Sequence, residues 1–493
     1  MSGAVDSSSR SLFKNAISQI GGRLLLSLGR LLAALMIVRL LGPERFGEYA
    51  LVLQFIVLFE WLADFGQTGI SVREICQNPA DERATLGALT TLKAVQGLFL
   101  ALLLPALLLA LRYPAEIVRA GVAGGLSVAC YAAVQMFRAD LAVRMRMERD
   151  VGAELGGLVV MLPLTLVACR AGAGVEILIA CYSAARIVFL LLLVWFSLGP
   201  GRPRLHLAGS RPSMELLLKA LPLGIAGLLV STYDSLATLM LSKMTDMGAI
   251  AQFASAMRFV FPVIIVVQAL LSAFYPSLAA TYRVNPVRFQ RLQQSALELS
   301  VLVGAGLFCG LFAGADFFMG LMGPSIRDAA PVLSVMSVVV LARSVTTAMS
   351  PLIVVAGKQG KALWLTAASI AFQAVMLLAL VPRLGIMGAA IGYLAVELAL
   401  GVVPVSVIGQ LVAKVRLDWS VPVRLIGWAG IAVAICKLLP LAGTIWSGIL
   451  AGLLFVTLIL ATGTLSVSSV RSVLSDIIAG RLARTAPPAA GAQ

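Results

Sequence analysis

The chain has 493 residues, of which 60% are hydrophobic and only 12% are charged. A soluble protein of this length could not expose so much apolar surface to water, so the composition excludes an ordinary soluble enzyme or binding domain. The net charge of +15 does not indicate a nucleic-acid partner. In membrane proteins basic residues gather on the cytoplasmic side, where they meet anionic lipid.

Apolar stretches long enough to cross a bilayer recur along the whole chain. A hydrocarbon core of about 30 Å needs about 20 apolar residues in a helix. The candidate spans are 17–41, 49–70, 85–111, 117–137, 151–169, 174–197, 221–242, 253–280, 295–314, 331–356, 364–382, 386–408, 425–441 and 444–466. The sequence therefore predicts an all-α integral membrane protein with about 14 transmembrane helices.

Basic residues fall mainly in every second gap between these spans. The richer set of gaps holds 23 of the 38 Lys and Arg residues, and the alternate gaps hold 9. Because Lys and Arg favour the cytoplasmic side of a membrane, this split predicts an even number of spans, with both termini in the cytoplasm.

The longest gap, about 198–220, is basic, rich in Pro and Gly, and follows six spans. Repeats related by an axis along the membrane normal are a known transporter plan. We therefore expect two six-helix lobes around a central cavity, plus two C-terminal helices. The expected parts are an N-terminal lobe 1–200, a cytoplasmic linker 201–220, a second lobe 221–408, two additional transmembrane helices 409–466, and a cytoplasmic amphipathic and disordered tail 467–493.

The motifs of common enzymes and metal sites are absent from the sequence. It has no Walker A loop, no HExxH and no GxSxG in a strand-to-helix context. The six cysteines are scattered without a CxxC pair and are interpreted as small apolar fillers. The outer gaps are too short for the soluble domain that a membrane polymerase or ligase would need. We therefore expect a transporter, not an enzyme, with neither cofactor nor metal.

Charged residues inside the predicted spans are the functional candidates, because a charge within a bilayer is costly. Guanidinium groups bind phosphate oxygens through a bidentate fork, so central arginines predict a cavity for an anionic substrate. The arginines are Arg30, Arg186, Arg258 and Arg343. Carboxylates could counter these charges or couple transport to H⁺ or Na⁺. They are Glu60, Asp64, Asp234 and Glu397. The alternative for each residue is a buried structural ion pair.

The N-terminal region carries a family resemblance. RLLGPERFGEYAL after the first span, and DFG and VRE at the end of the second, resemble polysaccharide-repeat flippases of the Wzx type. These belong to the multidrug/oligosaccharidyl-lipid/polysaccharide exporter superfamily. AGKQGK at 356–361 and LGIMGAAIGYL at 384–394 extend the resemblance. It implies two six-helix lobes around a cationic cavity that moves an undecaprenyl-pyrophosphate-linked oligosaccharide outward across the bacterial inner membrane.

The resemblance also implies partners: a lipid-linked oligosaccharide, membrane lipids, H⁺ or Na⁺, and polysaccharide polymerase and export machinery. Two relatives within the superfamily stay open as alternatives, namely a lipid II-type flippase and a cation-coupled multidrug exporter. A cation exporter would favour acidic cavity residues over basic ones, whereas the charges within the spans here are mixed. Sequence alone does not choose between glycolipid substrates.

Overall fold

The structure, a computed structural model, describes residues 2–197, 209–272, 274–439 and 444–464. Helices make up its secondary structure throughout this part of the chain. They form two compact units, Met1–Ala254 and Ser255–Gln493, which we call unit 1 and unit 2. The predicted division into lobes 1–200 and 221–408 stays a prediction. The start of the predicted linker and the predicted tail 467–493 lie outside the described residues.

Unit 1 contains the first eight helices and the start of the ninth. They are α1 (Ser2–Leu41), α2 (Pro43–Asp64), α3 (Gln67–Gln77), α4 (Glu82–Ala110), α5 (Ala115–Val143), α6 (Met147–Arg170), α7 (Val175–Ser197), α8 (Ser210–Met244) and the first residues of α9 (Met247–Ser272). A single 3-10 turn, Pro79–Asp81, precedes α4.

Unit 2 contains the rest of α9 and the helices that follow it. They are α10 (Tyr275–Thr281), α11 (Pro286–Ala313), α12 (Ala315–Met322), α13 (Pro324–Arg327), α14 (Ala330–Val355), α15 (Gln359–Val396), a π-helical turn (Glu397–Val402), α16 (Val403–Ala413), α17 (Ser420–Leu438) and α18 (Ile445–Ala461).

Among the described residues, 12 stretches are long and apolar enough to cross a membrane, and Ile445–Ala461 is a shorter apolar helix. One of the 12, Gln359–Ala413, has 55 residues, more than two crossings require. Gly385 interrupts it with φ 55° and ψ −133°, a conformation that essentially only glycine adopts. A side chain at Gly388 would collide with the carbonyl oxygen of Leu380, so the chain reverses here.

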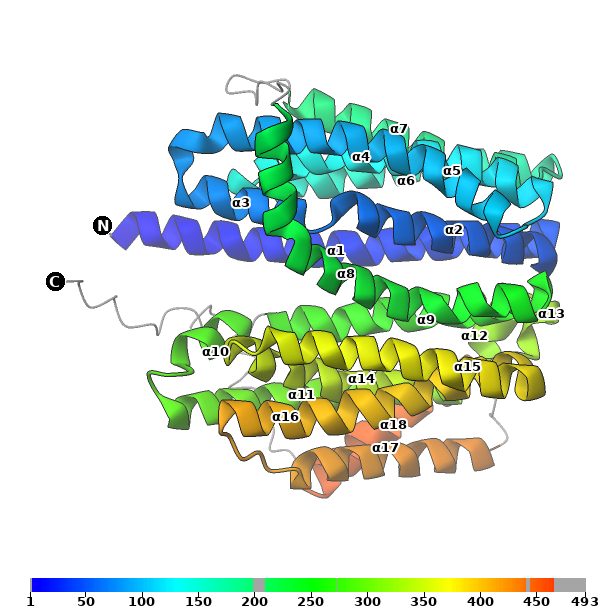
Figure 1. Cartoon of the computed structure of the whole chain (residues 1–493). Helices are drawn as coiled ribbons and strands as arrows, with labels where there is room; N and C mark the ends of the chain where they lie inside the picture. Colours follow the sequence, from blue (N-terminus) through cyan, green and yellow to red (C-terminus); the bar gives the residue numbers. More distant parts are fainter. Residues whose placement is uncertain (1, 198–208, 273, 440–443, 465–493) are drawn as a thin grey trace. The chain divides into compact units, whose positions relative to one another are not determined.

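The 55-residue stretch is therefore a pair of antiparallel helices joined at Gly385. Figure 1 agrees, because α16 runs back alongside the first part of α15. Counting two crossings here, eleven in the other long stretches and one in α18 gives fourteen within the described residues. The predicted all-α membrane fold is confirmed.

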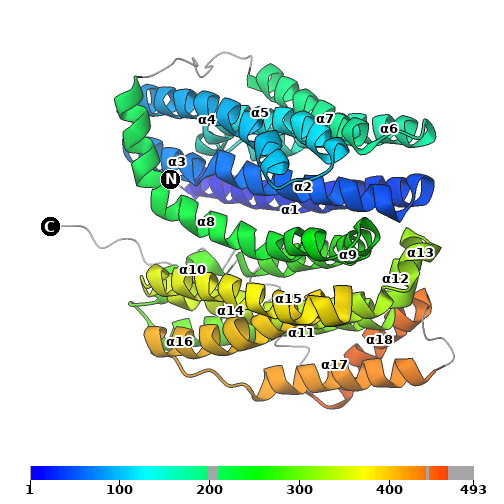
Figure 2. The same ribbon diagram turned by 45° about the vertical axis from the view of Figure 1, so that its right-hand side comes forward.

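Small residues let the helices of unit 1 approach closely. In α5, a side chain at Gly125 would collide with the carbonyl oxygen of Ala101 in α4, and one at Gly97 of α4 would lie 2.9 Å from the Cβ of Ala132. Glycine and alanine are enriched where helix backbones meet in membranes, since packing rather than the hydrophobic effect drives association there. Helices α4 and α5 therefore lie side by side along their length (Figure 2).

Helix α8 docks onto the other helices of unit 1. Gln54 Nε2 of α2 donates to Ser235 Oγ at 2.7 Å. At the end of α8, Ser242 and the hydroxyl of Tyr113 share a hydrogen bond of 2.6 Å, and Lys243 Nζ lies 3.5 Å from the centroid of the Tyr113 ring. Burial raises the pKa of the Tyr113 phenol, which keeps the hydroxyl neutral. Helix α8 is bent in Figure 1, and it contains Pro222, a residue type that kinks helices.

An apolar core and a few polar contacts join the helices of unit 2. Ser300 Oγ of α11 donates to the carbonyl of Ser344 in α14 at 2.6 Å. Ser447 Oγ of α18 donates to the carbonyl of Ala313 in α11, also at 2.6 Å. Phe455 of α18 is buried in the same apolar core as α11, α14 and α17. The two C-terminal helices are therefore packed into unit 2.

Candidate functional site

A buried arginine of α7 lies at the centre of a polar cluster in unit 1. Arg186 Nη2 donates to Glu60 Oε1 of α2 at 2.8 Å and to the hydroxyl of Tyr182 at 2.9 Å. The guanidinium also lies over the rings of Tyr131 and Tyr182, at 5.1 and 5.4 Å from their centroids. A charge away from water has to be paired and hydrogen-bonded, and here Glu60 and the tyrosines meet that need.

A second arginine, from α5, lies beside the first. Arg138 Nε donates to Asp150 Oδ1 of α6 at 2.8 Å, and Nη1 donates to the hydroxyl of Tyr131 at 3.4 Å. Its Nη2 lies 3.4 Å from Glu154 Oε2. Asp150 and Glu154 are four residues apart in one helix and therefore share a face, which allows one guanidinium to contact both.

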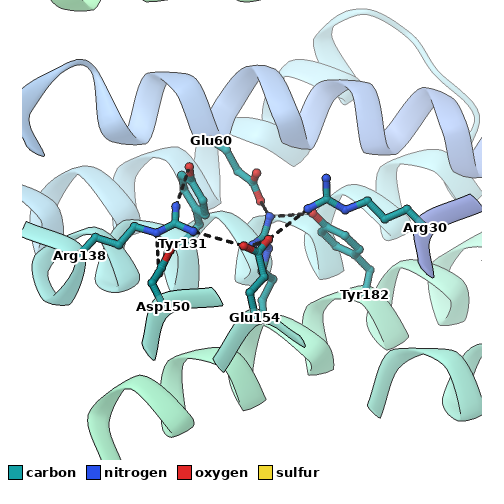
Figure 3. Close-up of polar contacts among 8 residues, drawn as sticks. Arg30, Glu60, Tyr131, Arg138, Asp150, Glu154 and Tyr182 are labelled. Atoms are coloured by element: carbon teal, nitrogen blue, oxygen red, sulfur yellow. Dashed lines mark hydrogen bonds and ion pairs between the residues drawn. The ribbon is translucent and has the colours of Figure 1, made fainter. Parts of the chain in front are cut away.

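Glu154 connects the three arginines of the cluster. Its Oε1 lies 3.1 Å from Arg30 Nη2 of α1 and 3.6 Å from Arg186 Nη1. Figure 3 shows these contacts as one continuous chain. We call the six charged residues the charge network; they are Arg30, Glu60, Arg138, Asp150, Glu154 and Arg186.

The charge network is most exposed at Arg30. The Arg30 side chain is 43% exposed, whereas that of Arg186 is 8% exposed. Three guanidinium groups face three carboxylates, so the network carries no net charge when all six are ionised. Its exposed end therefore presents a guanidinium that another anion could reach.

Glycines place the helices that carry the network. On α1, side chains at Gly22 and Gly29 would collide with Val151 and Leu158 of α6. Gly22 and Gly29 are seven residues apart in α1, and their partners Val151 and Leu158 are seven residues apart in α6. Residues at this spacing share a helix face, so one face of α1 lies against one face of α6. On α6, a side chain at Gly157 would meet the carbonyl oxygen of Ala185 at 2.6 Å. The close approach of α1, α6 and α7 therefore brings Arg30, Glu154 and Arg186 together.

Asp64 lies at a different place in unit 1, where α2 ends. Phe65 and Gly66 both have positive φ, which separates α2 from α3. The fully buried Lys93 of α4 donates to the carbonyls of Ala63 and Asp64 at 2.5 and 2.9 Å, and its Nζ lies 3.8 Å from Asp64 Oδ1. An ammonium at a helix C-terminus complements the free carbonyls and the helix dipole.

In unit 2 the structure brings two predicted residues together. Arg343 Nε of α14 donates to Glu397 Oε2 at 3.3 Å, and its guanidinium lies 5.7 Å from the centroid of the Tyr393 ring. Glu397 begins the π-helical turn, a deviation often found at functional sites. A side chain at Gly401 would lie 2.9 Å from Glu397 Oε1, so the glycine leaves room for the carboxylate.

The predicted site residues thus divide between the two units. Arg30, Arg186 and Glu60 belong to one network, and Asp64 lies beside Lys93. Asp234 is half-buried on α8 of unit 1, and Arg258 is half-buried on α9 within unit 2. That all four arginines line one cavity stays a prediction.

Sequence reasoning missed half of the charge network. Arg138 lies just beyond the predicted span 117–137, and Asp150 and Glu154 were not singled out, although Glu154 lies within the predicted span 151–169. The signal was present, because an acidic pair spaced i, i+4 lies at the start of that span. Its partners come from other helices, which a single chain segment does not reveal.

The arrangement favours binding of an anion rather than covalent chemistry. Guanidinium groups cannot act as proton donors near neutral pH, and they bind phosphate or carboxylate oxygens as a planar fork. Within the described residues there is no group of three or more His, Cys, Asp or Glu side chains that could hold a metal ion.

Comparison with known protein families gives a match. The family described as polysaccharide biosynthesis protein matches residues 12–282, more than half of the chain. No curated relative matches by sequence.

Solved structures of membrane transporters share the fold. The lipid II flippase MurJ, in an inward closed conformation, matches with a TM-score of 0.73 and 11% identity, over 90% of this chain and 98% of that one. An inward-facing multidrug resistance MATE family transporter of the MOP superfamily matches with a TM-score of 0.63 and 16% identity, over 79% of this chain and 94% of that one. A MOP superfamily transporter from Pyrococcus furiosus matches with a TM-score of 0.59 and 17% identity, over 82% of this chain and 96% of that one. It is described with a binding pocket of reverse polarity.

Proposed function

Because the chain belongs to the polysaccharide biosynthesis protein family, we propose that it is a flippase for a polyprenyl-pyrophosphate-linked oligosaccharide. It is a multi-pass membrane transporter of the MOP superfamily and not an enzyme. The proposed step moves the glycan head group outward across the bacterial inner membrane. No covalent bond changes in this step.

The observation that carries this proposal is the exposed guanidinium of Arg30 within a span of α1. An arginine in a membrane helix is retained where it serves a pathway or a pair. Arg30 makes its ion pair with Glu154 and yet leaves 43% of its side chain accessible. A pyrophosphate oxygen is the kind of anion that a guanidinium binds through two parallel hydrogen bonds.

The proposed transport cycle follows from this site. The pyrophosphate and sugars bind against Arg30 and Arg186, and Arg258 and Arg343 are further proposed contacts. The polyprenyl tail stays in lipid. Rocking of one lobe against the other then exposes the head group to the outside, as in transporters built from two repeats. A polysaccharide polymerase is the proposed recipient of the product.

Replacement of Arg30 tests this function. Arg30→Ala should abolish flipping of polyprenyl-pyrophosphate oligosaccharide in proteoliposomes, and Arg30→Lys should restore it only in part because an ammonium forms no fork. Arg119→Ala is the matched control, since Arg119 is 61% exposed and lies 3.8 Å from its partner Glu176, outside the charge network. Normal flipping by Arg30→Ala would refute the assigned role.

A lipid II-type flippase is the second candidate. The observation in its favour is the fold likeness to MurJ over 90% of this chain. Offering both lipid II and a polyprenyl-pyrophosphate oligosaccharide in separate proteoliposome assays separates the two. Transport of lipid II alone would replace the first proposal with the second.

The proposed orientation places both termini in the cytoplasm. Cys76 is the exposed free cysteine and the other five are buried, so Cys76→Ser provides a background for labelling. In intact cells, a membrane-impermeant maleimide should label Ala171→Cys, in the turn after α6, and not Met145→Cys, in the turn after α5. The reverse pattern would invert the proposed topology.

Coupling to H⁺ or Na⁺ through Glu60, Asp64, Asp234 or Glu397 is part of the proposal. An ion can bias only states for which its affinity differs. Asp234→Asn mimics a protonated carboxyl, and we expect it to remove the dependence of flipping on an imposed H⁺ or Na⁺ gradient. Gradient-dependent flipping that survives this change would remove Asp234 from the mechanism.

A further inference from the structure

The carboxylates of the charge network are not equivalent. Glu60 and Asp150 each accept a short hydrogen bond of 2.8 Å from a single guanidinium, Arg186 and Arg138 respectively. Glu154 instead lies 3.1 to 3.6 Å from all three arginines. It is the shared anion of the network, and its longer contacts make each of its pairs the weaker one.

The pair between Glu154 and Arg30 lies at the accessible end of the network. The side chain of Glu154 is 18% exposed and that of Arg30 is 43% exposed. In the proposed substrate cavity, water would screen such a pair and lower the free energy needed to separate it. The pairs at Arg186 and Arg138 lie deeper, with 8% and 19% of the arginine side chains exposed.

Separation from Arg30 would not leave Glu154 as an isolated charge. Its Oε1 would keep Arg186 at 3.6 Å and its Oε2 would keep Arg138 at 3.4 Å. An unpaired carboxylate inside a membrane helix would be strongly disfavoured. Because two guanidinium groups remain, Arg30 can turn toward another anion at small cost.

We propose that Glu154 competes with the pyrophosphate of the substrate for Arg30 and thereby sets how tightly the head group is held and how readily it is released. This inference rests on the proposed flippase function. In the empty site Glu154 occupies Arg30. When the pyrophosphate arrives it replaces the carboxylate on Arg30, and when the head group leaves, Glu154 takes Arg30 back. A head group that stayed tightly bound would be released slowly and would limit turnover, so a transporter benefits from a competitor that weakens its binding.

Binding of inorganic pyrophosphate to the full-length protein in nanodiscs tests this competition. Glu154→Gln removes the competing charge and should tighten binding by about tenfold or more, the order of one charged hydrogen bond. Glu116→Gln is the matched control, because it removes an equal charge from unit 1 at a carboxylate that pairs with Arg45 at 2.6 Å, outside the network. The control should change the Kd by less than about twofold.

The double variant Arg30→Ala/Glu154→Gln shows whether the gain acts through Arg30. It should bind pyrophosphate as weakly as Arg30→Ala alone. Glu154→Asp is a second variant that keeps the charge on a shorter side chain, and it should give intermediate tightening without loss of folding. Flipping by Glu154→Gln should be slower than wild type although binding is tighter.

The outcomes separate this inference from the function on which it rests. Unchanged or weaker binding by both Glu154 variants, with binding still lost in Arg30→Ala, would overturn the competition and leave the flippase site intact. Tight binding by the double variant would also overturn it. Unchanged binding by Arg30→Ala would instead remove the pyrophosphate site of the proposed function.

Discussion

Replacing Arg186 by Met should destabilise the protein far more than neutralising its partner Glu60. Methionine removes the hydrogen bond of 2.8 Å to Glu60 and the contact of 3.6 Å to Glu154. The Glu60 carboxylate, 10% exposed, then loses the guanidinium to which it is bound. Loss of one partner of a buried pair costs about 3–5 kcal/mol, because the other charge stays in a medium that solvates it poorly.

Neutralising Glu60 should destabilise the protein less, because Arg186 keeps other partners. In Glu60→Gln the amide oxygen still accepts from Arg186, and Glu154 at 3.6 Å still provides an opposite charge. We expect a loss of about 1–2 kcal/mol, the range for weakening a charged hydrogen bond. The difference between the two variants is therefore about 1–4 kcal/mol.

Denaturant titration of the protein in mixed micelles measures both losses as free energies of unfolding. Arg119→Met serves as the control, since its exposed pair at 3.8 Å should contribute about 0–1 kcal/mol. The double variant Arg186→Met/Glu60→Leu should recover much of the stability lost in Arg186→Met, because no unpaired charge remains. Equal losses in Arg186→Met and Glu60→Gln would refute the reasoning.

Three further predictions concern other positions. Lys93→Met should lower the free energy of unfolding by about 2–3 kcal/mol in the same titration, because the carbonyls that end α2 lose a charged donor. Gly385→Ala should cost about 1–3 kcal/mol at its φ of 55°, whereas Gly430→Ala, in open space on α17, should cost nothing measurable. Arg343→Leu should destabilise unit 2, and adding Glu397→Leu should restore most of the lost stability. The fraction of protein that stays monodisperse after heating measures both effects.

The helices could be predicted from the sequence because a bilayer imposes one length scale on every crossing. Even the reversal at Gly385 was anticipated as the gap between spans 364–382 and 386–408. The same reasoning singled out Arg30, Glu60 and Arg186, since a charge among apolar residues stands out in any window.

Pairing between helices could not be predicted in this way. Glu154 joins Arg30, 124 residues away, because Gly29 lets α1 approach α6 at Leu158. Nothing in the local pattern of either helix specifies that approach. Asp64 is a predicted coupling residue, but its charged neighbour Lys93 comes from another helix, 29 residues away in the sequence. The Lys93 side chain points to the end of α2.

The glycine contacts between α4 and α5 have a mechanical consequence. Two helices whose backbones touch at Gly125 and Gly97 cannot slide or rotate against each other without steric overlap, because no flexible side chains lie between them to rearrange. During any transport cycle this pair should move as one rigid body. Spin labels on the exposed faces of α4 and α5, at Leu98 and Val122, should therefore report one unchanging distance while other distances in the molecule change.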